Sequence, residues 1–275
     1  MSLVKKVVAV AAMTCLSSLF AADVSSATSH SKTAQAKPME EKLPWYFTVS
    51  SGYAWTMKPG ITNPDTSFWD ASNQGYDQDL TDGSFIGLGF GKELISWLDV
   101  DVEWTQYRQF VYNKHQTGTS STPAFTGSHR TRFFDLDNDG FLASFRLHLP
   151  RDWNWDMGCI SVSPFAGAGL GFGVNQMTNF HTVGHNSTTS VGSTSSIGEP
   201  VTKVAFAWQA NVGLSFRPTN SAASMNFAYR YYDGGTFNGP SRIIDNTANG
   251  TWVTCKAWEG RVKTNQFLVY LKYDM

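Results

Sequence analysis

In the last nine residues of this chain, every second position carries a large apolar or aromatic side chain, and Leu268, Tyr270, Lys272 and Asp274 lie between them. The large side chains are Phe267, Val269, Leu271, Tyr273 and Met275. Because successive side chains of a β-strand point to opposite faces, this pattern predicts a strand with one apolar face. The same two-residue period recurs in seven earlier segments, at 45–57, 85–91, 98–104, 141–149, 162–173, 204–216 and 225–231, and the final strand begins near residue 262.

The second face of the predicted strands is mostly small or polar. In segment 98–104, for example, Asp99, Asp101 and Glu103 alternate with the apolar set. Outward apolar side chains suit lipid, and side chains alone can fill the interior of an eight-stranded barrel. A soluble up-and-down barrel would point its apolar residues inward instead. The sequence therefore predicts an all-β fold, an eight-stranded antiparallel up-and-down transmembrane β-barrel over 45–275.

Composition agrees with a membrane barrel. Charged residues make up 16% of the chain, against about 25% in a typical soluble domain, and aromatic residues reach 14%. No apolar run reaches the length of about 20 residues that a helical membrane span needs. The formal net charge of -1 gives no basis for nucleic acid as a partner.

The links between the predicted strands alternate in length. Those at 94–97, 150–157 and 218–221 are short, whereas the four others are long and mostly polar. In bacterial outer-membrane barrels, short turns face the periplasm and long loops face outward. We therefore expect an outer-membrane location, four long extracellular loops and two periplasmic termini.

The start of the chain has the order of a secretory signal. Lys5 and Lys6 precede the mostly apolar stretch 7–22, and small residues follow. This predicts a signal peptide over 1–27, cleaved after residue 22 or residue 27. Residues 28–44 are polar and contain two prolines, which predicts a flexible periplasmic lead into the barrel.

Four segments carry a resemblance to a known group of proteins. They are Pro-Phe-Ala-Gly-Ala-Gly-Leu-Gly at 164–171, Ala-Trp-Gln-Ala-Asn-Val-Gly at 207–213, Tyr-Arg-Tyr-Tyr-Asp at 229–233, and the alternation at 267–273. They resemble the small outer-membrane barrels of the OmpA-like and opacity-protein superfamily, over roughly residues 45–275. The resemblance implies a shared scaffold with divergent loops, and it implies no activity. We expect no cofactor.

Several charged or ionisable side chains are predicted to point into the barrel. They are Asp99, Asp101, Glu103, Arg146, His148, Arg230 and Lys272, which we place near one depth. In so narrow a barrel, opposite charges should pair and fill the lumen as a packed polar core. A narrow ion path or gate is the alternative.

Aromatic residues predict the two membrane interfaces. Ten residues separate Trp45 from Trp55, which spans about 23 Å on a tilted strand. The predicted girdle comprises Trp45, Trp55, Trp97, Trp104, Trp208 and Tyr273.

One acidic segment has the spacing of a metal site. Asp135, Asp137 and Asp139, followed by Gly140, match the first half of a calcium loop. Arg146 stands where the loop needs its final glutamate. The other interpretation is an acidic strand start at the membrane rim.

Two histidines suggest chemistry that the surrounding sequence argues against. His181 and His185 lie four apart, and His185 begins a His-Asn-Ser sequence that superficially resembles lipid A deacylases. Ser, Thr and Gly around them predict flexible coil, which cannot hold a metal or keep a base against a nucleophile. Having found no convincing catalytic residues, we expect a protein that is not an enzyme.

The cysteines of the mature chain are predicted to remain unpaired with each other. Cys159 falls at the periplasmic end of a strand and Cys255 in an external loop. A disulfide needs Cα atoms within roughly 7 Å, far less than the membrane thickness between them.

These features favour a structural and surface-interaction role, adhesin-like or opacity-like, through the outer loops. Expected partners are outer-membrane lipid and lipopolysaccharide, and host or matrix molecules; the oligomeric state is open. A passive channel for small solutes is the alternative, because inward glycines of 85–91 and 162–173 would leave a gap. A lipid A-modifying enzyme is the third hypothesis. The loop aromatics Phe125, Phe180, Phe237 and Trp252 either anchor a partner or cap the barrel mouth.

Overall fold

The computed structural model describes residues 43–62, 80–117, 128–149, 153–185, 193–219, 221–245 and 250–275, within the unit Leu43–Met275. All their regular elements are strands: β1 (Trp45–Thr56), β2 (Gly83–Ile95), β3 (Leu98–Thr117), β4 (His129–His148), β5 (Trp155–Asp156), β6 (Ile160–His185), β7 (Ser193–Gly198), β8 (Val201–Pro218), β9 (Ala223–Asn238), β10 (Arg242–Asp245), β11 (Trp252–Thr254) and β12 (Glu259–Asp274). In these ranges, no helix is long and apolar enough to span a membrane.

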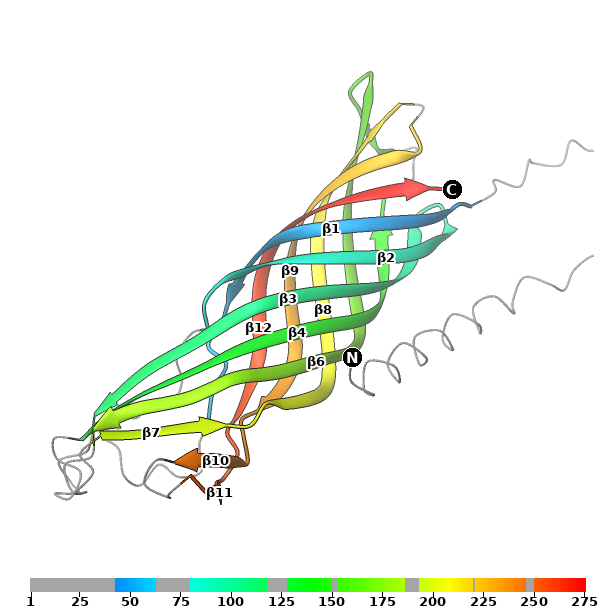
Figure 1. The fold of residues 1–275 in the computed structure, drawn as a ribbon. Coiled ribbons are helices and arrows are strands. Elements are labelled where there is room, and N and C mark those ends of the chain that lie inside the picture. The colour runs from blue at the N-terminus through cyan, green and yellow to red at the C-terminus, as the bar shows by residue number, and fades with distance from the viewer. Residues whose placement is uncertain are drawn as a thin grey trace, which may run out of the picture. The chain divides into compact units, whose positions relative to one another are not determined.

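Eight of the described strands close into a ring (Figure 1). Their order is β1, β2, β3, β4, β6, β8, β9 and β12, and every neighbouring pair is antiparallel. The first and last strands join from Tyr46 opposite Asp274 to Thr56 opposite Thr264. This ring is the eight-stranded up-and-down barrel that the alternating sequence predicts, so the predicted fold class is confirmed.

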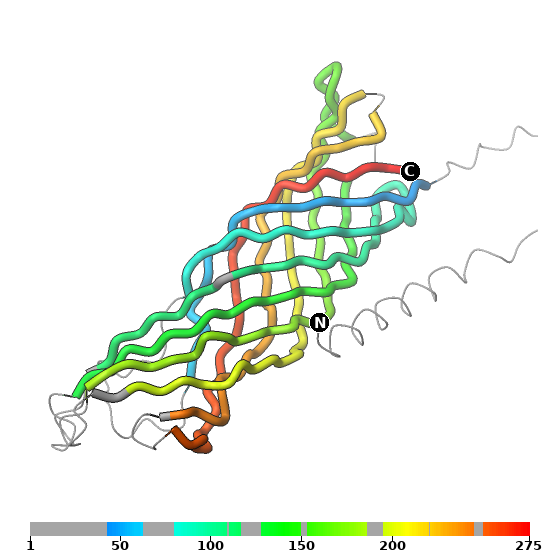
Figure 2. Tube along the Cα trace, in the orientation of Figure 1, coloured from blue at the N-terminus to red at the C-terminus, as the bar shows by residue number. Residues whose placement is uncertain are grey.

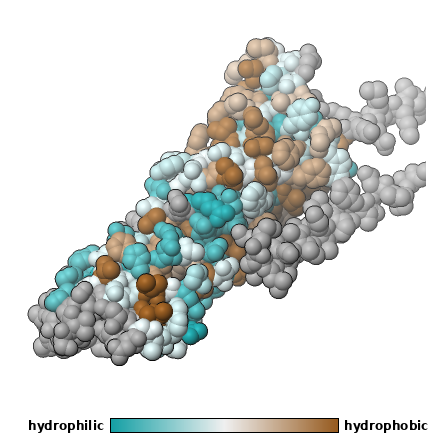
Figure 3. Space-filling model, in the orientation of Figure 1, coloured by the Kyte–Doolittle hydropathy of each residue, from teal (hydrophilic) through white to brown (hydrophobic). Residues whose placement is uncertain are grey.

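The ring is apolar outside and largely polar inside. On β1, Val49 and Tyr53 are 45% and 46% exposed, whereas the inward Thr48 and Ser50 are buried. Apolar side chains gather over the ring in Figure 3. Outward apolar and inward polar residues are the arrangement of an outer-membrane barrel.

Three ring strands are the longest, and the other five have 12 to 18 residues. β3, β4 and β6 have 20, 20 and 26 residues, against 12 and 13 in β1 and β2. They run on together beyond β1 and β2 (Figure 2), and β7, β10 and β11 continue their sheet. We call the end where β1 begins and β12 finishes the terminal end. We call the sheet at the other end the distal extension; it comprises 110–117, 129–136 and 177–185 with β7, β10 and β11.

Inside the distal extension, the polarity is reversed. Its inner face belongs to an apolar core with Phe110, Tyr112, Phe134, Leu136, Met177, Phe180, Phe237 and Trp258. The rings of Tyr112 and Phe134 stack with centroids 4.5 Å apart, and Phe180 meets Trp258 edge-on at 5.5 Å. Phe180 and Phe237 therefore cap the barrel mouth, whereas Trp252 is 45% exposed and Phe125 lies outside the described residues.

The distal extension corrects the expectation of long irregular loops. Segments 114–132, 175–202 and 233–258 were predicted as loops, yet their described parts are largely strand. His181 and His185 lie in β6, where His185 is paired with His129 of β4, so the prediction of flexible coil there is wrong. The outward face of this part of the sheet mixes polar and apolar residues, so the sequence loses its visible two-residue period although the strand pairing continues.

Candidate functional site

The seven predicted inward residues lie on four strands and pair inside the barrel. Arg146 of β4 contacts Asp101 at 3.2 Å, and His148 contacts Asp99 of β3 at 3.1 Å. Lys272 of β12 lies 2.9 Å from Asp99. Arg230 of β9 lies 2.9 Å from Glu103. Arg146 also lies 3.9 Å from Asp99, so the structure joins these seven side chains through ion pairs of Arg146, Lys272 and Arg230 with carboxylates and through the contact of His148 with Asp99.

One further member was missed from the sequence. Glu93 of β2 is 2% exposed and lies 2.9 Å from the Lys272 amine. Glu93 continues the inward parity of Gly89 and Gly91, which was a usable signal. The predicted strand ended before it, because the turn was placed at residue 94 and the residue before Glu93 is the charged Lys92, which breaks the apolar outward set.

The pairs form two layers, which corrects the expectation of a single depth. Arg230 is paired across strands with Gln266 of β12, six residues before Lys272. Its guanidinium donates to Glu103 at 2.9 Å, to Gln209 at 3.0 Å and to Gln266 at 2.6 Å. It also donates to the Tyr107 hydroxyl at 3.2 Å. The Arg230 side chain, 1% exposed, therefore has charged and neutral acceptors around it, which offsets the cost of burying its charge.

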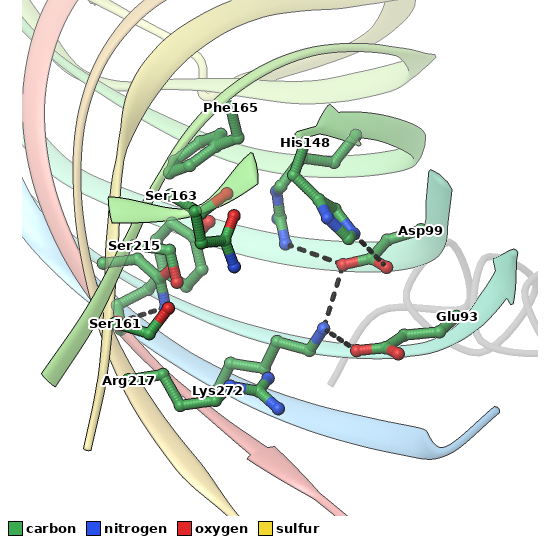
Figure 4. Close-up of a pocket in the computed structure, with 13 residues that line it drawn as sticks. Glu93, Asp99, His148, Ser161, Ser163, Phe165, Ser215, Arg217 and Lys272 are labelled. Carbon is green, nitrogen blue, oxygen red and sulfur yellow. Dashed lines mark hydrogen bonds and ion pairs between the residues drawn. The ribbon is translucent and has the colours of Figure 1, made fainter. Parts of the chain in front are cut away.

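The other layer faces a cavity of about 240 Å³ near the terminal end, which we call the terminal vestibule. Figure 4 shows Lys272 between Glu93 and Asp99 on one wall, with His148 on the far side of Asp99. Hydroxyl groups and Arg217 also line the cavity, and Arg217 pairs with Asp274 at 2.7 Å. The serines of the cavity are Ser161, Ser163 and Ser215. The vestibule is thus a polar pocket in which the acidic and basic groups already neutralise one another.

Side chains fill the lumen beyond the vestibule. A cavity of about 20 Å³, with room for about one water molecule, lies between Arg146 and Arg230. Past Arg230, the Tyr232 hydroxyl donates to Asn138 at 2.8 Å, and Asn138 donates to Asn175 at 2.8 Å. The apolar core of the distal extension follows. These layers leave the vestibule as a pocket rather than as the mouth of an open path.

The inward glycines do not leave the gap expected of them. A Cβ built on Gly91 would lie 2.5 Å from the ring of Tyr46, and one on Gly169 would lie 2.3 Å from the Ser144 hydroxyl. Neighbouring side chains therefore occupy the space that the glycines vacate. This removes the sequence argument for a channel.

The three aspartates of the possible calcium loop lie on the outward face of β4. Asp137 pairs with Arg108 at 2.8 Å, Asp139 accepts from Gln106 at 3.0 Å, and Asp135 accepts from Asn179 at 2.5 Å. Residues 135–140 are extended strand, so the turn that a calcium loop needs at its glycine is not formed. They are not a strand start either, because β4 begins at His129.

The predicted girdle residues lie at several levels of the ring. Trp45, Trp97 and Tyr273 are near the terminal end, and Trp55 is at the opposite end of β1. The outward residue after Trp104 on β3 is the polar Gln106, which puts Trp104 at the border of the apolar band. Trp208 packs on Tyr231 with ring centroids 5.1 Å apart, while Val204 and Phe206 extend the apolar band of β8 beyond it. The girdle as a whole stays a prediction.

Both cysteines of the described ranges are free thiols. Cys159 is exposed just before β6 at the terminal end. Cys255 follows β11, and its thiol donates to the Pro240 carbonyl at 3.3 Å. Burial raises the pKa of the Cys255 thiol, which makes it less reactive than an exposed thiol.

The closed ring of antiparallel strands, with apolar side chains outside and mostly polar side chains inside, defines an outer-membrane β-barrel protein. No family model matches the chain, and no curated protein matches it. Among solved structures, it is similar to OprG from Pseudomonas aeruginosa, with 13% identity, coverage of 85% of this chain and 97% of that one, and a TM-score of 0.40. It is also similar to Ail of Yersinia pestis in complex with a heparin analogue, with 12% identity, coverage of 84% and 99%, and a TM-score of 0.35.

A third match corrects one expectation. The chain is similar to the outer-membrane protease OmpT from Escherichia coli, with 11% identity, coverage of 84% and 97%, and a TM-score of 0.38. The sequence predicts a protein that is not an enzyme, because it shows no convincing catalytic residues. Since the matches include a protease, that exclusion does not hold.

Proposed function

We propose that this chain is a surface-interaction protein that the barrel anchors in the outer membrane and that acts through its distal extension. The observation that carries the proposal is the ordered sheet that β3, β4, β6, β7, β10 and β11 build beyond the ring. A barrel that served only as an anchor would not need this sheet. Surface segments held on a rigid scaffold are where binding usually resides.

The same proposal sets the orientation. Two links at the terminal end are short, with residues 96–97 between β2 and β3 and residues 219–222 between β8 and β9. The third terminal-end link, residues 149–159, is as long as the shortest link at the other end, residues 118–128; the remaining links at the other end are longer and include β7, β10 and β11. Short turns face the periplasm in this architecture, so the terminal end is periplasmic and the distal extension faces outward.

A passive channel is the second candidate, and the terminal vestibule is the observation in its favour. The layers of Arg230 and Asn138, and then the aromatic core, stand between the vestibule and the exterior. We therefore expect no single-channel openings from the purified protein in planar bilayers. Reproducible openings that grow when Arg230 is replaced by alanine would support the channel and count against a filled lumen.

The proposed function is tested by removing the distal extension while keeping the ring. In one variant, short turns replace the segments beyond Tyr107 of β3 and Gln176 of β6 and the sheet built on them. Bacteria expressing the full chain should adhere to wells coated with fibronectin, collagen or heparan sulfate, and the variant should lose this adhesion. A gel shift between unheated and boiled samples checks that the variant still forms a barrel.

A second variant provides a matched control. It carries a replacement of the terminal-end link at residues 149–159, which faces the periplasm in the proposed orientation. This variant should adhere like the full chain. Unchanged adhesion after removal of the distal extension, or absence of adhesion by the full chain, would refute the proposed function.

A further inference from the structure

The outward face of the distal extension carries a row of apolar and aromatic side chains across five strands. We call these residues the distal row: Phe133, His181, Ile197, Ile244 and Trp252. Each is the direct cross-strand partner of the next, from β4 through β6, β7 and β10 to β11. Ile197 is 63% exposed and Trp252 is 45% exposed. Neighbouring strands lie about 4.8 Å apart, so the row is about 19 Å wide.

The distal row is separate from the lipid-facing band. On β4, the outward residues between Phe133 and Phe141 are Asp135, Asp137 and Asp139. Figure 3 likewise shows a hydrophobic patch toward the distal end, with hydrophilic surface between it and the hydrophobic residues over the ring. Acyl chains contact one continuous apolar band, so lipid is not the occupant that this row suits.

The sheet beneath the row is apolar on its inner face too. Phe134 and Phe180, the inward neighbours of Phe133 and His181, are buried in the aromatic core. A sheet with two apolar faces is normally covered on both. An exposed apolar patch bordered by polar residues is typical of a protein interaction site.

The row ends on a strand that can accept another strand. β11 is last in the strand order of the sheet, and within the described ranges no strand pairs with its second edge. All three β11 residues are exposed. Unpaired backbone groups along such an edge are a template for an added strand, whose alternate side chains would lengthen the distal row beyond Trp252.

The charge beside this edge indicates what the added strand should carry. Arg242 of β10 lies over the Trp252 ring, 5.3 Å from its centroid, and is exposed. The distal row itself contains no carboxylate. Arg242 shares the outward face with Trp252. A segment with an apolar and an acidic residue two positions apart would present both on that face, with the apolar side chain beside Trp252 and the acidic group within reach of Arg242.

We infer that the distal row and the edge of β11 bind an extended segment of a partner protein that carries apolar and acidic residues in turn along one face, two positions apart, and that adds to the sheet as a strand. The inference rests on the proposed function and names the surface and the kind of partner through which it operates. Main-chain hydrogen bonds to β11 supply part of the affinity, and the distal row with Arg242 supplies the selectivity.

The test uses the purified full chain in detergent micelles and a fluorescent peptide of repeating Val-Thr-Glu-Thr, which puts valine and glutamate on one face and threonine on the other. The peptide should bind saturably. A peptide of repeating Val-Thr-Lys-Thr should bind at least about tenfold more weakly. A Val-Thr-Glu-Thr peptide that is N-methylated at every residue keeps the side chains but loses its edge-pairing donors, so it should not bind.

Protein variants locate the site. Trp252→Ala and Arg242→Ala should each weaken binding about tenfold, the loss expected for an important interface side chain. Val253→Ser is the matched control, because Val253 is on the same strand and 42% exposed but belongs to the opposite face, paired with Ile243. It should leave binding within about twofold of the unchanged protein. The gel shift on boiling checks that each variant folds.

Several outcomes would overturn the inference. They are absence of peptide binding, equal binding of the N-methylated or the lysine peptide, and equal effects of Val253→Ser and Trp252→Ala. Self-association that Trp252→Ala abolishes would make the row an interface between copies of this chain instead. Binding of lipopolysaccharide vesicles that depends on Trp252 would make it a lipid contact. None of these outcomes changes the adhesion assay of the distal-extension variant, so failure here and failure of the proposed function remain distinguishable.

Discussion

The ring and the distal extension are built from the same strands with opposite polarity. Within the ring, β3 points Asp101 and Glu103 inward and Val100 outward. Farther along the same strand, Phe110 and Tyr112 point inward and are fully buried. The hydrogen-bonded pairing of β3 with β4 continues through both regions. Strand pairing therefore does not depend on which face is apolar; the surroundings of the sheet decide that.

Irregular pairing marks the passage between the two regions. The register of β3 against β4 shifts between Tyr107 and Phe110, and that of β4 against β6 shifts between Phe133 and Asp135. Nearby on β6, Asn179 has a φ of 53°, a left-handed conformation that asparagine tolerates better than most residues. A bulge adds one residue to a strand, so the positions that point inward shift by one after it. Apolar residues beyond the bulge can therefore face the core.

The largest effect should come from the ring interior, through Arg230→Met. Glu103 would then be a buried carboxylate without its cation, and we expect the free energy of unfolding to fall by about 3–5 kcal/mol. Urea unfolding in lipid vesicles measures this change. The double variant Arg230→Met with Glu103→Gln should recover most of the loss. A single variant as stable as the unchanged protein would mean that this pair does not hold the lumen.

The next effect tests whether the distal extension has a core of its own. Phe134→Ala removes a ring with 1% exposure and should cost about 3 kcal/mol. Hydrogen exchange should rise in 129–136 and 177–185 and stay slow in the ring. Phe133→Ala is the matched control. The Phe133 ring precedes Phe134 on β4 and points outward, so its removal should cost less than about 1 kcal/mol. Equal effects of both variants would contradict the inward and outward assignment.

A matched pair of lysine substitutions separates lipid from water outside the sheet. Leu170 of the ring and Ile197 of the distal extension are 60% and 63% exposed. Leu170→Lys should cost about 2–4 kcal/mol of unfolding free energy, because its charge enters the lipid band. Ile197→Lys should cost less than about 0.5 kcal/mol, because that position faces water. Similar costs for the two would erase the boundary between the regions.

The smallest effect should come from the polar belt between the regions. Asp137→Asn breaks an ion pair whose Arg108 side chain is 45% exposed. We expect a loss below about 1 kcal/mol at low salt, which disappears at 1 M salt as screening removes the attraction. A larger, salt-independent loss would show that Asp137 is held in a less solvated site than its exposure indicates.

Much of the ring could be predicted from the sequence. Lipid requires an apolar outward set, so the alternation of Phe267 to Met275 and of the seven other segments is visible without any partner strand. The same parity placed Asp99, Asp101 and Arg146 inward before their contacts were known. Their separation into two layers was not predictable, because depth depends on the cross-strand register of β9 and β12.

The distal extension could not be predicted from the sequence, because its outward face does not have to be apolar. Water on its outer face allows histidine, threonine, aspartate and isoleucine in the same outward set, so no simple period marks β4 before Gly140 or β6 after Val174. Glycine and serine near His185 favoured coil, and pairing with β4 and β7 overrode that preference. Local propensity is weak against paired neighbours on both sides.

By itself, the sequence determined a transmembrane barrel with a charged interior, because contact with lipid imposes a local two-residue rule on every spanning strand. Only the tertiary structure decided that β3, β4 and β6 continue beyond the ring and that Arg230 and Lys272 occupy different layers. It alone aligned the distal row from Phe133 to Trp252. These features depend on which residues of distant strands lie opposite each other, and bulges and nonlocal hydrogen bonds set that register.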